Sequence, residues 1–347
     1  MNPGGATDEA VRVDIGEDFP DEASLLEELG RVRSSLEDEI ARRVIGQSDI
    51  VEKLLITLLA DGHALLVGVP GLAKTLLVST LAEALDLGFS RIQFTPDLMP
   101  SDITGTEVLE EEAQTGRRQF RFVPGPIFSN VILADEINRT PPKTQAALLQ
   151  AMQEGEVTVG NETFPLARPF FVLATQNPIE QEGTYPLPEA QLDRFMFELR
   201  ISYPGHEEET RVAALTADDQ RSPVSTVVGG PEIERFQRLV RRVPVPPSLL
   251  EYVVRLTRAT RPAEPEAPEF IRRTVSWGAG PRASQHAVLA AKARAVLRGR
   301  PVPNLDDVRA VAPDVLRHRV VLGFEAEAKG RSADDLVAEL IELSGRW

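Results

Sequence analysis

The chain has 347 residues, a length typical of about two domains, and its 38 Lys and Arg against 53 Asp and Glu give a net charge of −15. With 42% hydrophobic residues it has enough apolar material for a sizeable core, which excludes a wholly disordered protein. The absence of cysteine excludes a disulfide scaffold, a cysteine–zinc site and a thiol nucleophile. The acidic balance argues against broad binding to nucleic acid or anionic membranes, which both favour Lys and Arg surfaces.

No membrane segment or secretory signal is expected. No stretch reaches about 18 consecutive apolar residues, the length that a membrane-spanning helix needs. The opening MNPGGATDEA lacks the basic and apolar regions of a signal peptide. We therefore expect a cytoplasmic protein.

Residues 1–30 form an acidic lead in which Arg12 is the one basic residue. Self-repulsion and few apolar side chains predict disorder, in its early part above all. A solubilising tail is the simpler interpretation, and a regulatory or partner-binding tail is the alternative. Leucines at spacings of three and four, beginning at Leu25, predict a helix from Ser24 to Arg43.

Short apolar runs then alternate with helical patterns. Helices are predicted at 51–58, 75–85 and 143–154. Alternation of this kind, with strands apolar throughout, indicates an α/β fold whose five-stranded parallel sheet is flanked by helices on both faces. The five predicted strands are Ala64–Gly68, Arg91–Phe94, Val131–Ala134, Phe170–Ala174 and Phe197–Ile201.

Two insertions interrupt the alternation. Residues 102–128 hold two strand-like runs joined through Thr115-Gly116, which predicts a β-hairpin. Residues 156–166 alternate around Gly160-Asn161, which predicts a second one.

Helical spacing dominates after Pro204-Gly205, with one possible strand at Thr226–Val228. We therefore divide the chain into the lead 1–30, an α/β domain over 31–204 and an all-helical domain over 205–347. Helices of the last part are predicted at 207–217, 231–241, 248–260, 268–277, 282–298, 305–312 and 333–344.

The run from Gly68 to Thr75 (GVPGLAKT) lies between a predicted strand and a predicted helix, which is the context of a phosphate-binding loop. Backbone N–H groups of such a loop surround phosphate oxygens. Lys74 would reach the β- and γ-phosphates, and Thr75 would bind Mg²⁺. Ala73 stands where the usual pattern has its last glycine, and we expect it to take a negative φ at the start of the helix.

Polar residues follow two other predicted strands. Asp135 would hold Mg²⁺ through water, and Glu136 would polarise an attacking water. An apolar run ending in Asp-Glu is common, so this interpretation depends on the phosphate-binding loop earlier in the chain. Asn177 could bind the γ-phosphate or that water, although an Asx-turn before Pro178 is the simpler interpretation.

Two arginines could sense the phosphates. Arg194 could stabilise transition-state charge, or could be a surface residue paired with Asp193 or Glu189. Arg282 opens a predicted helix and could contact the γ-phosphate from the second domain. An exposed arginine there is the alternative, which the helix dipole disfavours.

In this order, these segments resemble the AAA+ ATPases. The Ala before Lys74, the run from Ala134 to Arg139 (ADEINR) and the long run from Ala174 to Phe195 resemble the MoxR branch. Val44-Ile45-Gly46-Gln47 resembles the adenine-side motif of the superfamily. The resemblance covers residues 36–347.

The resemblance implies an α/β core with a C-terminal helical lid, and ATP with Mg²⁺ bound between them in a homo-oligomeric ring, usually a hexamer. It assigns catalytic or sensing roles to Lys74, Glu136, Asn177, Arg194, which acts in trans, and Arg282, in cis or in trans. Metal ligation falls to Thr75 and Asp135. The implied nucleotide-binding residues are Val44, Ile45, Gly46, Gln47, Gly68, Pro70, Gly71, Leu72, Ala73, Lys74, Thr75, Leu76 and Asp135.

The resemblance also implies that both hairpins line the pore side of the ring, and that the protein remodels protein complexes beside a partner with a von Willebrand factor A domain. A nucleic-acid motor is one alternative, but acidic residues cancel the basic ones of the first hairpin. A magnesium-chelatase-like subunit shares the same inserts and is the second. A nucleotide switch without turnover is the third, against which an intact Glu136 argues.

Overall fold

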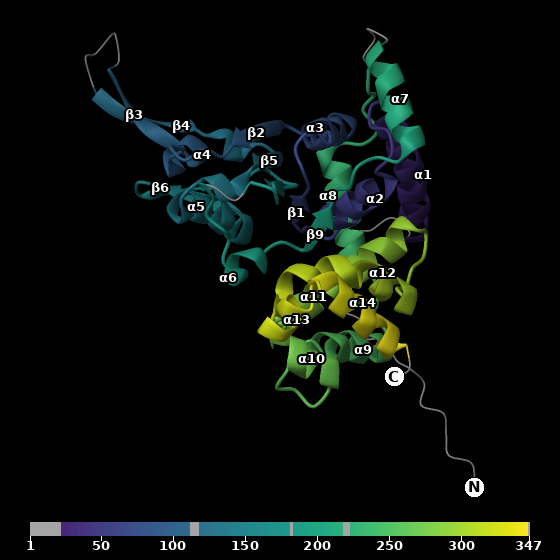
Figure 1. The fold of residues 1–347 in the computed structure, drawn as a ribbon. Helices are drawn as coiled ribbons and strands as arrows, with labels where there is room; N and C mark the ends of the chain where they lie inside the picture. The colour runs from purple at the N-terminus through teal and green to yellow at the C-terminus, as the bar shows by residue number, and fades with distance from the viewer. Residues whose placement is uncertain (1–21, 112–117, 181–182, 218–222, 346–347) are drawn as a thin grey trace. The chain divides into compact units, whose positions relative to one another are not determined.

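The five predicted strands form one sheet in the computed structural model, which describes residues 22–111, 118–180, 183–217 and 223–345 (Figure 1). They are β1 (Ala64–Val67), β2 (Phe89–Gln93), β5 (Val131–Asp135), β8 (Phe171–Gln176) and β9 (Phe197–Arg200). Their order across the sheet is β2–β5–β8–β1–β9. The pairs β2–β5, β5–β8 and β1–β8 are parallel, so all their carboxyl ends meet at one edge. The predicted α/β fold is confirmed.

Helices connect the strands. Those predicted at 75–85 and 143–154 are present almost as predicted. Two short helices, α4 and α6, were not predicted, because a helix of about one turn shows no apolar periodicity in the sequence. The helices are α2 (Ser48–Leu59), α3 (Lys74–Ala84), α4 (Pro100–Thr104), α5 (Pro142–Glu154), α6 (Glu189–Leu192) and α7 (His206–Ala217), with 3₁₀ turns η1 (Pro126–Phe128) and η2 (Ile137–Arg139).

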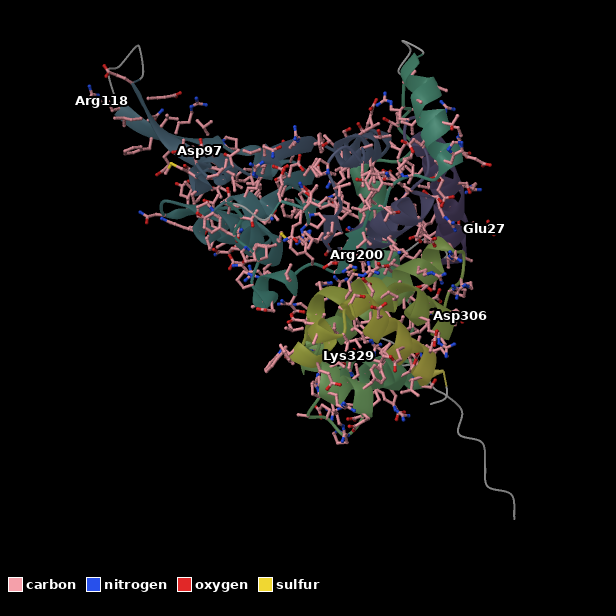
Figure 2. All side chains as sticks on the ribbon, viewed as in Figure 1. Glu27, Asp97, Arg118, Arg200, Asp306 and Lys329 are labelled. Atoms are coloured by element: carbon pink, nitrogen blue, oxygen red, sulfur yellow. The ribbon has the colours of Figure 1, made fainter. Side chains whose placement is uncertain are left out.

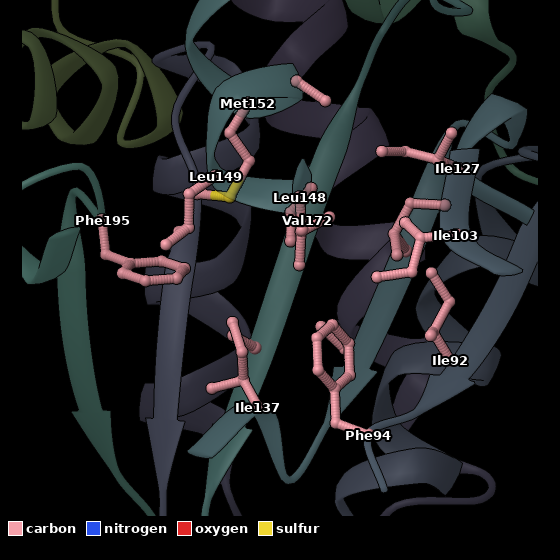
Figure 3. Packing of buried hydrophobic residues seen from close by; sticks show 14 of the residues in the cluster. Ile92, Phe94, Ile103, Ile127, Ile137, Leu148, Leu149, Met152, Val172 and Phe195 are labelled. Atoms are coloured by element: carbon pink, nitrogen blue, oxygen red, sulfur yellow. The ribbon is translucent and has the colours of Figure 1, made fainter. Parts of the chain in front are cut away.

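Both faces of the sheet are buried. Ile132 and Val172 point into a cluster with Leu148 and Phe195 (Figure 3). Leu133, on the opposite face of its strand, is also fully buried. Burial of successive residues explains why these strands appear in the sequence as continuous apolar runs rather than as alternating ones.

Both predicted hairpins are present. β3 (Gly105–Glu111) pairs antiparallel with β4 (Arg118–Pro124), and β6 (Glu156–Val159) pairs with β7 (Glu162–Pro165). The turn predicted at Thr115-Gly116 lies outside the described residues. Phe122 of β4 stacks on Phe164 of β7 with ring centroids 4.2 Å apart. An aromatic contact therefore joins the two hairpins.

The C-terminal part is helical, as predicted, with one difference. Residues 275–277, predicted as the end of a helix, instead form a strand that pairs with residues 321–322, whereas 226–228 form no strand. Pairs this short give no periodic signal in the sequence. The elements are α8 (Gly230–Arg242), α9 (Pro247–Arg258), α10 (Glu269–Thr274), β10 (Val275–Trp277), α11 (Pro281–Leu297), α12 (Leu305–Leu316), η3 (Arg317–Arg319), β11 (Val321–Leu322), α13 (Phe324–Ala328) and α14 (Ala333–Ser344).

Contacts divide the chain into two compact units. Among the described residues, one unit comprises those within 34–195 and 199–234 and contains most of the sheet, and the other comprises 22–33, 196–198 and 235–345. This division places residues 205–234 with the sheet, whereas the predicted border lies at residue 204. None of the helices in the described residues is both long enough and apolar enough to span a membrane.

The helix predicted from Ser24 to Arg43 is present as α1, and it includes the last residues of the segment 1–30 that we described as an acidic lead. Helix α1 (Glu22–Ala41) begins at residue 22, because Leu25 and Leu29 are 1% and 3% exposed and stabilise its first turns. Residues 1–21 lie outside the described part of the chain.

His63 lies immediately before β1, at the amino-terminal end of that strand, and its ring hydrogen-bonds to two backbone groups. Its Nδ1 accepts a hydrogen bond from the Val172 N–H at 3.1 Å, so the ring proton must lie on Nε2, 3.2 Å from the Met152 carbonyl oxygen. The Nδ1 contact requires the neutral imidazole, because the protonated ring has no acceptor nitrogen, and burial lowers the pKa of His63 below its ordinary value.

This burial predicts acid sensitivity. The unfolded chain protonates His63 near pH 6.5 while the folded chain keeps it neutral, so its contribution is complete above about pH 6.5 and falls as the pH drops. Between pH 7.5 and 5, the free energy of unfolding should fall with decreasing pH in both proteins. In wild type the fall should be steeper than in His63→Gln, by up to about 1.4 kcal/mol per pH unit. Denaturant titrations of both proteins measure this difference. Equal losses would contradict the neutral imidazole.

Candidate functional site

The turn from Gly68 to Thr75 connects β1 to α3 at the carboxyl edge of the sheet. Gly71 has φ +85° and Ala73, the residue that caps α3, has φ +55°. The expectation of a negative φ at Ala73 is therefore wrong: the turn needs a left-handed residue before α3 begins, and alanine adopts that conformation under strain. The Ala73 side chain makes no cap, so the first N–H groups of this 11-residue helix are available to an anion.

Lys74 lies inside this turn. Its Nζ donates to the Gly68 carbonyl at 2.5 Å. Burial lowers the pKa of Lys74, and the nearby charges of Asp135 and Glu136 partly oppose that shift. The structure thus brings together the cation and the two carboxylates that were predicted from separate motifs.

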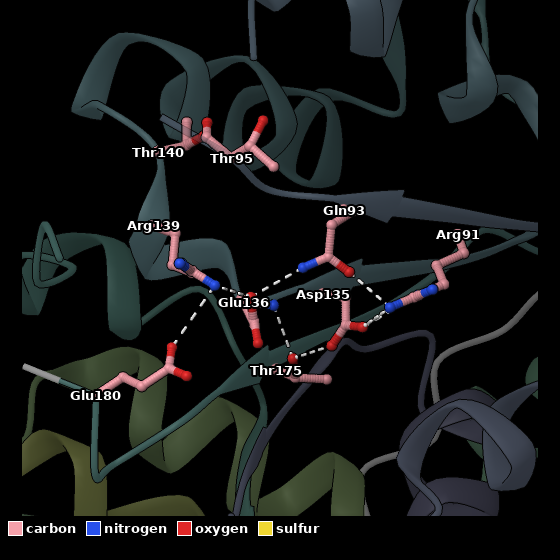
Figure 4. A network of polar contacts seen from close by, with 9 residues as sticks. All are labelled: Arg91, Gln93, Thr95, Asp135, Glu136, Arg139, Thr140, Thr175 and Glu180. Carbon is pink, nitrogen blue, oxygen red and sulfur yellow. Dashed lines mark hydrogen bonds and ion pairs between the residues drawn. The ribbon is translucent and has the colours of Figure 1, made fainter. Parts of the chain in front are cut away.

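Asp135 ends β5 and is held from two sides (Figure 4). Its Oδ1 accepts from the Thr175 hydroxyl at 2.6 Å, and its Oδ2 accepts from Arg91 Nη2 at 2.6 Å. Thr175 comes from β8 and Arg91 from β2, the strands on either side of β5. The carboxylate therefore has a fixed direction at the edge of the sheet.

Glu136 follows with φ +57°, a left-handed conformation that turns its carboxylate away from that of Asp135. Its N–H donates to the Thr175 hydroxyl at 2.8 Å. Its Oε2 accepts from Gln93 Nε2 and from Arg139 Nη1, both at 2.9 Å (Figure 4).

Asn177 combines both interpretations drawn from the sequence. Its Oδ1 accepts from the Ile179 N–H at 3.2 Å, as in an Asx-turn. Its Nδ2 is buried and has no hydrogen-bond partner. A buried amide N–H without a partner costs stability unless a ligand accepts from it, so Asn177 fits a phosphate or water.

The segment from Val44 to Gln47 contacts the same turn. Gln47 Nε2 donates to the Leu72 carbonyl at 3.2 Å, while Gln47 Oε1 is buried without a partner. Val44 and Ile45 are buried. The predicted adenine-side motif thus lies beside the phosphate-binding turn and offers an unused acceptor.

These residues fit a nucleoside triphosphate and its metal ion. The open N–H groups of α3, the Lys74 ammonium and Asn177 Nδ2 are all donors that suit phosphate oxygens. Within the described ranges, no group of three or more acidic or histidine side chains could hold a metal ion alone. Mg²⁺ is usually bound by one or two protein oxygens together with substrate phosphates, which matches Thr75 and Asp135.

The geometry of this edge does not test the roles predicted for two arginines. Arg194 follows α6, and its guanidinium pairs with no other described residue. Arg282 opens α11 in the other compact unit. Their assigned roles stay predictions.

Besides Asp135 and Glu136, the residues drawn in Figure 4 were not predicted as site residues, and four of them contact those two carboxylates or the Glu136 N–H: Arg91, Gln93, Arg139 and Thr175. Arg91 and Gln93 share one face of β2, and Gln93 lies in register with Asp135. Polar residues two apart in a strand that neighbours Asp-Glu are the signal that could have found them. Nothing in the sequence indicated that Thr175 joins two strands.

Comparison with known proteins defines the class. Residues 63–197 match the model of the ATPase family associated with various cellular activities (AAA), and residues 269–340 match the AAA lid domain. A solved structure of a candidate ATPase from Cytophaga hutchinsonii has a TM-score of 0.85 and 42% identity, covering 92% of this chain and 96% of that one. The fold is that of an AAA-type ATPase with its lid domain.

Similar proteins identify the family to which the chain belongs within the AAA ATPases. Chaperone MoxR1 of Mycobacterium tuberculosis and the uncharacterized protein YeaC of Bacillus subtilis are each 45% identical over 307 residues, which is 88% of this chain and 79% and 91% of the relatives. Protein MoxR of Methylorubrum extorquens is 33% identical over 306 residues, 82% of this chain and 86% of that protein. The chain belongs to the MoxR family of AAA+ ATPases.

The strained turn generates a prediction. A left-handed alanine costs about 1–2 kcal/mol, and glycine avoids that cost. Ala73→Gly should raise the free energy of unfolding by about 0.5–1 kcal/mol, because the freedom of glycine in the unfolded chain offsets part of the gain. Chemical denaturation measures it. Ala338→Gly, at an exposed helical position of α14, is the control and should lower the free energy by about 1 kcal/mol. A loss at position 73 would contradict the strain.

Proposed function

We propose that this chain hydrolyses ATP to ADP and phosphate as a subunit of a homo-oligomeric ring, usually a hexamer in this superfamily, and uses that reaction to remodel protein complexes. The observation that carries the proposal is the convergence of Lys74, Asp135 and Glu136 beside the open N-terminus of α3. Membership of the MoxR family agrees with it, and so does the name of the Mycobacterium tuberculosis relative, which is called a chaperone.

Each residue then has a chemical task. The α3 N–H groups and Lys74 bind the phosphates, and Asn177 Nδ2 donates to the γ-phosphate or to the attacking water. Glu136 orients that water and accepts its proton while oxygen bonds to the γ-phosphorus. The bond from the γ-phosphorus to the bridging oxygen breaks, and ADP leaves with its electron pair. Mg²⁺, held by Thr75, Asp135 and phosphate oxygens, would neutralise charge on the phosphates.

Two arginines complete the proposal. Arg194 reaches the phosphates of the neighbouring subunit, in agreement with a guanidinium that no other described residue holds. Arg282 senses the γ-phosphate from the helical lid. Hydrolysis therefore requires assembly.

The side chains exposed on the first hairpin, β3–β4, favour a protein client over a nucleic acid. Leu109 and Phe120 lie opposite each other in register and are 54% and 71% exposed. The basic residues beside them are neutralised, because Arg121 pairs with Glu110 at 2.6 Å and Arg118, near the hairpin end in Figure 2, pairs with Glu111 at 3.1 Å. An apolar, charge-balanced hairpin suits an apolar polypeptide. The proposed partner has a von Willebrand factor A domain.

Glu136→Gln tests the reaction. The amide keeps the shape of the side chain but cannot accept a proton, so we expect unchanged ATP affinity and a kcat reduced about 100-fold or more. Steady-state phosphate release and binding of a fluorescent ATP analogue measure the two quantities. Because this variant holds ATP, capture on it followed by mass spectrometry identifies the client. Wild-type turnover in Glu136→Gln would refute the role of Glu136, and a wild-type protein without turnover would refute the proposed function.

Subunit mixing tests whether Arg194 acts in trans. Lys74→Ala should lose ATP binding, and Arg194→Ala should lose turnover, since such arginines contribute about 10³–10⁵ in rate. Equal mixtures should regain about a quarter of wild-type turnover, because half the sites keep Lys74 and half of those adjoin an intact Arg194. Lys74→Ala mixed with the double variant is the control and should stay inactive. Verified mixed rings without recovery would place Arg194 outside the neighbouring site.

A further inference from the structure

A groove of about 610 Å³ lies on the compact unit that contains most of the helical C-terminal part. It is lined by the first turns of α1, by the end of α8 with the two residues that follow it, and by the turn between α11 and α12. All of its lining residues belong to that one unit. Pockets that bind ligands have volumes of roughly 300–1,000 Å³, and none of the residues assigned to ATP lines this groove.

The uncharged part of the groove is apolar. Leu26 of α1, Leu239 of α8 and Val243 line it, and its other uncharged residues are alanine, glycine and proline. No side-chain hydroxyl or amide is among the lining residues. An occupant is therefore stabilised there by the burial of its own apolar side chains.

Glu22 and Glu27 are the two charged residues that line the groove. Both are exposed, as Figure 2 shows for Glu27 on α1, and neither carboxylate forms an ion pair with another described residue. Arg300, in the turn after α11, does not neutralise them, because it donates to Asp307 at 2.7 Å. Carboxylates beside an apolar surface favour a cationic occupant and disfavour nucleic acid and anionic membranes.

A glycine inside α1 keeps the groove open. Gly30 lies in the interior of this 20-residue helix, where glycine is among the least favourable residues. No atom outside its own stretch of helix lies within 4 Å of the place where a Cβ at this position would be, so packing does not require glycine. Gly30 is four residues from Leu26 and lies on the same face of the helix. A side chain at position 30 would stabilise the helix and narrow the groove.

We propose that this groove binds a basic amphipathic helix of another protein. None of its lining residues belongs to a strand, so an occupant cannot extend a sheet there and must bind through its side chains. Apolar side chains of the partner lie on Leu26 and Leu239, and its Lys and Arg side chains lie beside Glu22 and Glu27. This interaction does not depend on ATP hydrolysis.

The chain's own residues 1–21 are a poorer occupant. They immediately precede Glu22, but they contain six acidic residues and one arginine. The two carboxylates that favour a basic partner therefore repel this segment.

Fluorescently labelled peptides of about 18 residues, which is five helical turns, test the proposal with the full chain. The probe has leucines at helical spacing and lysines elsewhere. Fluorescence anisotropy should show that it binds at least about ten-fold more tightly than a peptide with glutamate in place of lysine. It should exceed a peptide with serine in place of leucine by a similar factor.

Variants of α1 locate the binding site. Gly30→Trp fills the groove and should weaken binding of the probe about ten-fold or more. Glu22→Gln and Glu27→Gln should each weaken it about two- to five-fold and reduce its dependence on salt. Asp38→Asn, at an exposed position of the same helix outside the groove, is the matched control and should bind like wild type. Melting temperatures show whether Gly30→Trp folds; if it does not, the two glutamine variants still test the proposal.

Four results would overturn the proposal. Two are equal affinities of Gly30→Trp and wild type, and equal affinities of the leucine and serine probes. The third is displacement of the probe by an equal concentration of a synthetic peptide of residues 1–21, which would assign the groove to this chain's own N-terminal segment. The fourth is a smaller oligomer in sedimentation of Gly30→Trp, which would assign the groove to a second copy of the chain.

Discussion

One hydroxyl group fixes the chemistry at the edge of the sheet. Thr175 Oγ1 donates to the Asp135 carboxylate at 2.6 Å and accepts from the Glu136 N–H at 2.8 Å. Since a hydroxyl has one proton, it can satisfy both neighbours only in this orientation. The contact joins β8 to the end of β5, and the two adjacent carboxylates bind different partners: Asp135 accepts from Thr175 and Arg91, and Glu136 accepts from Gln93 and Arg139.

Backbone strain gathers at the same edge. Gln47, Ala73 and Glu136 all have φ between +55° and +60°, a region that costs a side chain about 1–2 kcal/mol. Contacts hold two of these residues, since Gln47 donates to the Leu72 carbonyl and the Glu136 N–H donates to Thr175. Strained positions persist only where the surrounding structure maintains them, so these contacts keep the strained backbone in place.

Two buried polar atoms without hydrogen-bond partners lie near the phosphate-binding turn. Asn177 Nδ2 and Gln47 Oε1 lie on segments that flank the phosphate-binding turn, one a donor and the other an acceptor. Leaving such atoms unpaired costs about 1–3 kcal/mol each. The donor suits phosphate and the acceptor suits an amino group, so their placement agrees with a nucleotide that extends from one to the other.

The sequence by itself determined the parallel sheet, both hairpins and the helical C-terminal part, because apolar runs are local patterns, and its spaced motifs proposed Lys74, Asp135, Glu136 and Asn177 as candidate site residues. It could not give the left-handed φ of Ala73 or the short β10–β11 pair. Those depend on what each segment packs against. Only the tertiary structure decided that Thr175, Gln93 and Arg139, from separate elements, converge on Asp135 and Glu136. Strand order and register bring them together, and neither can be read from one strand alone.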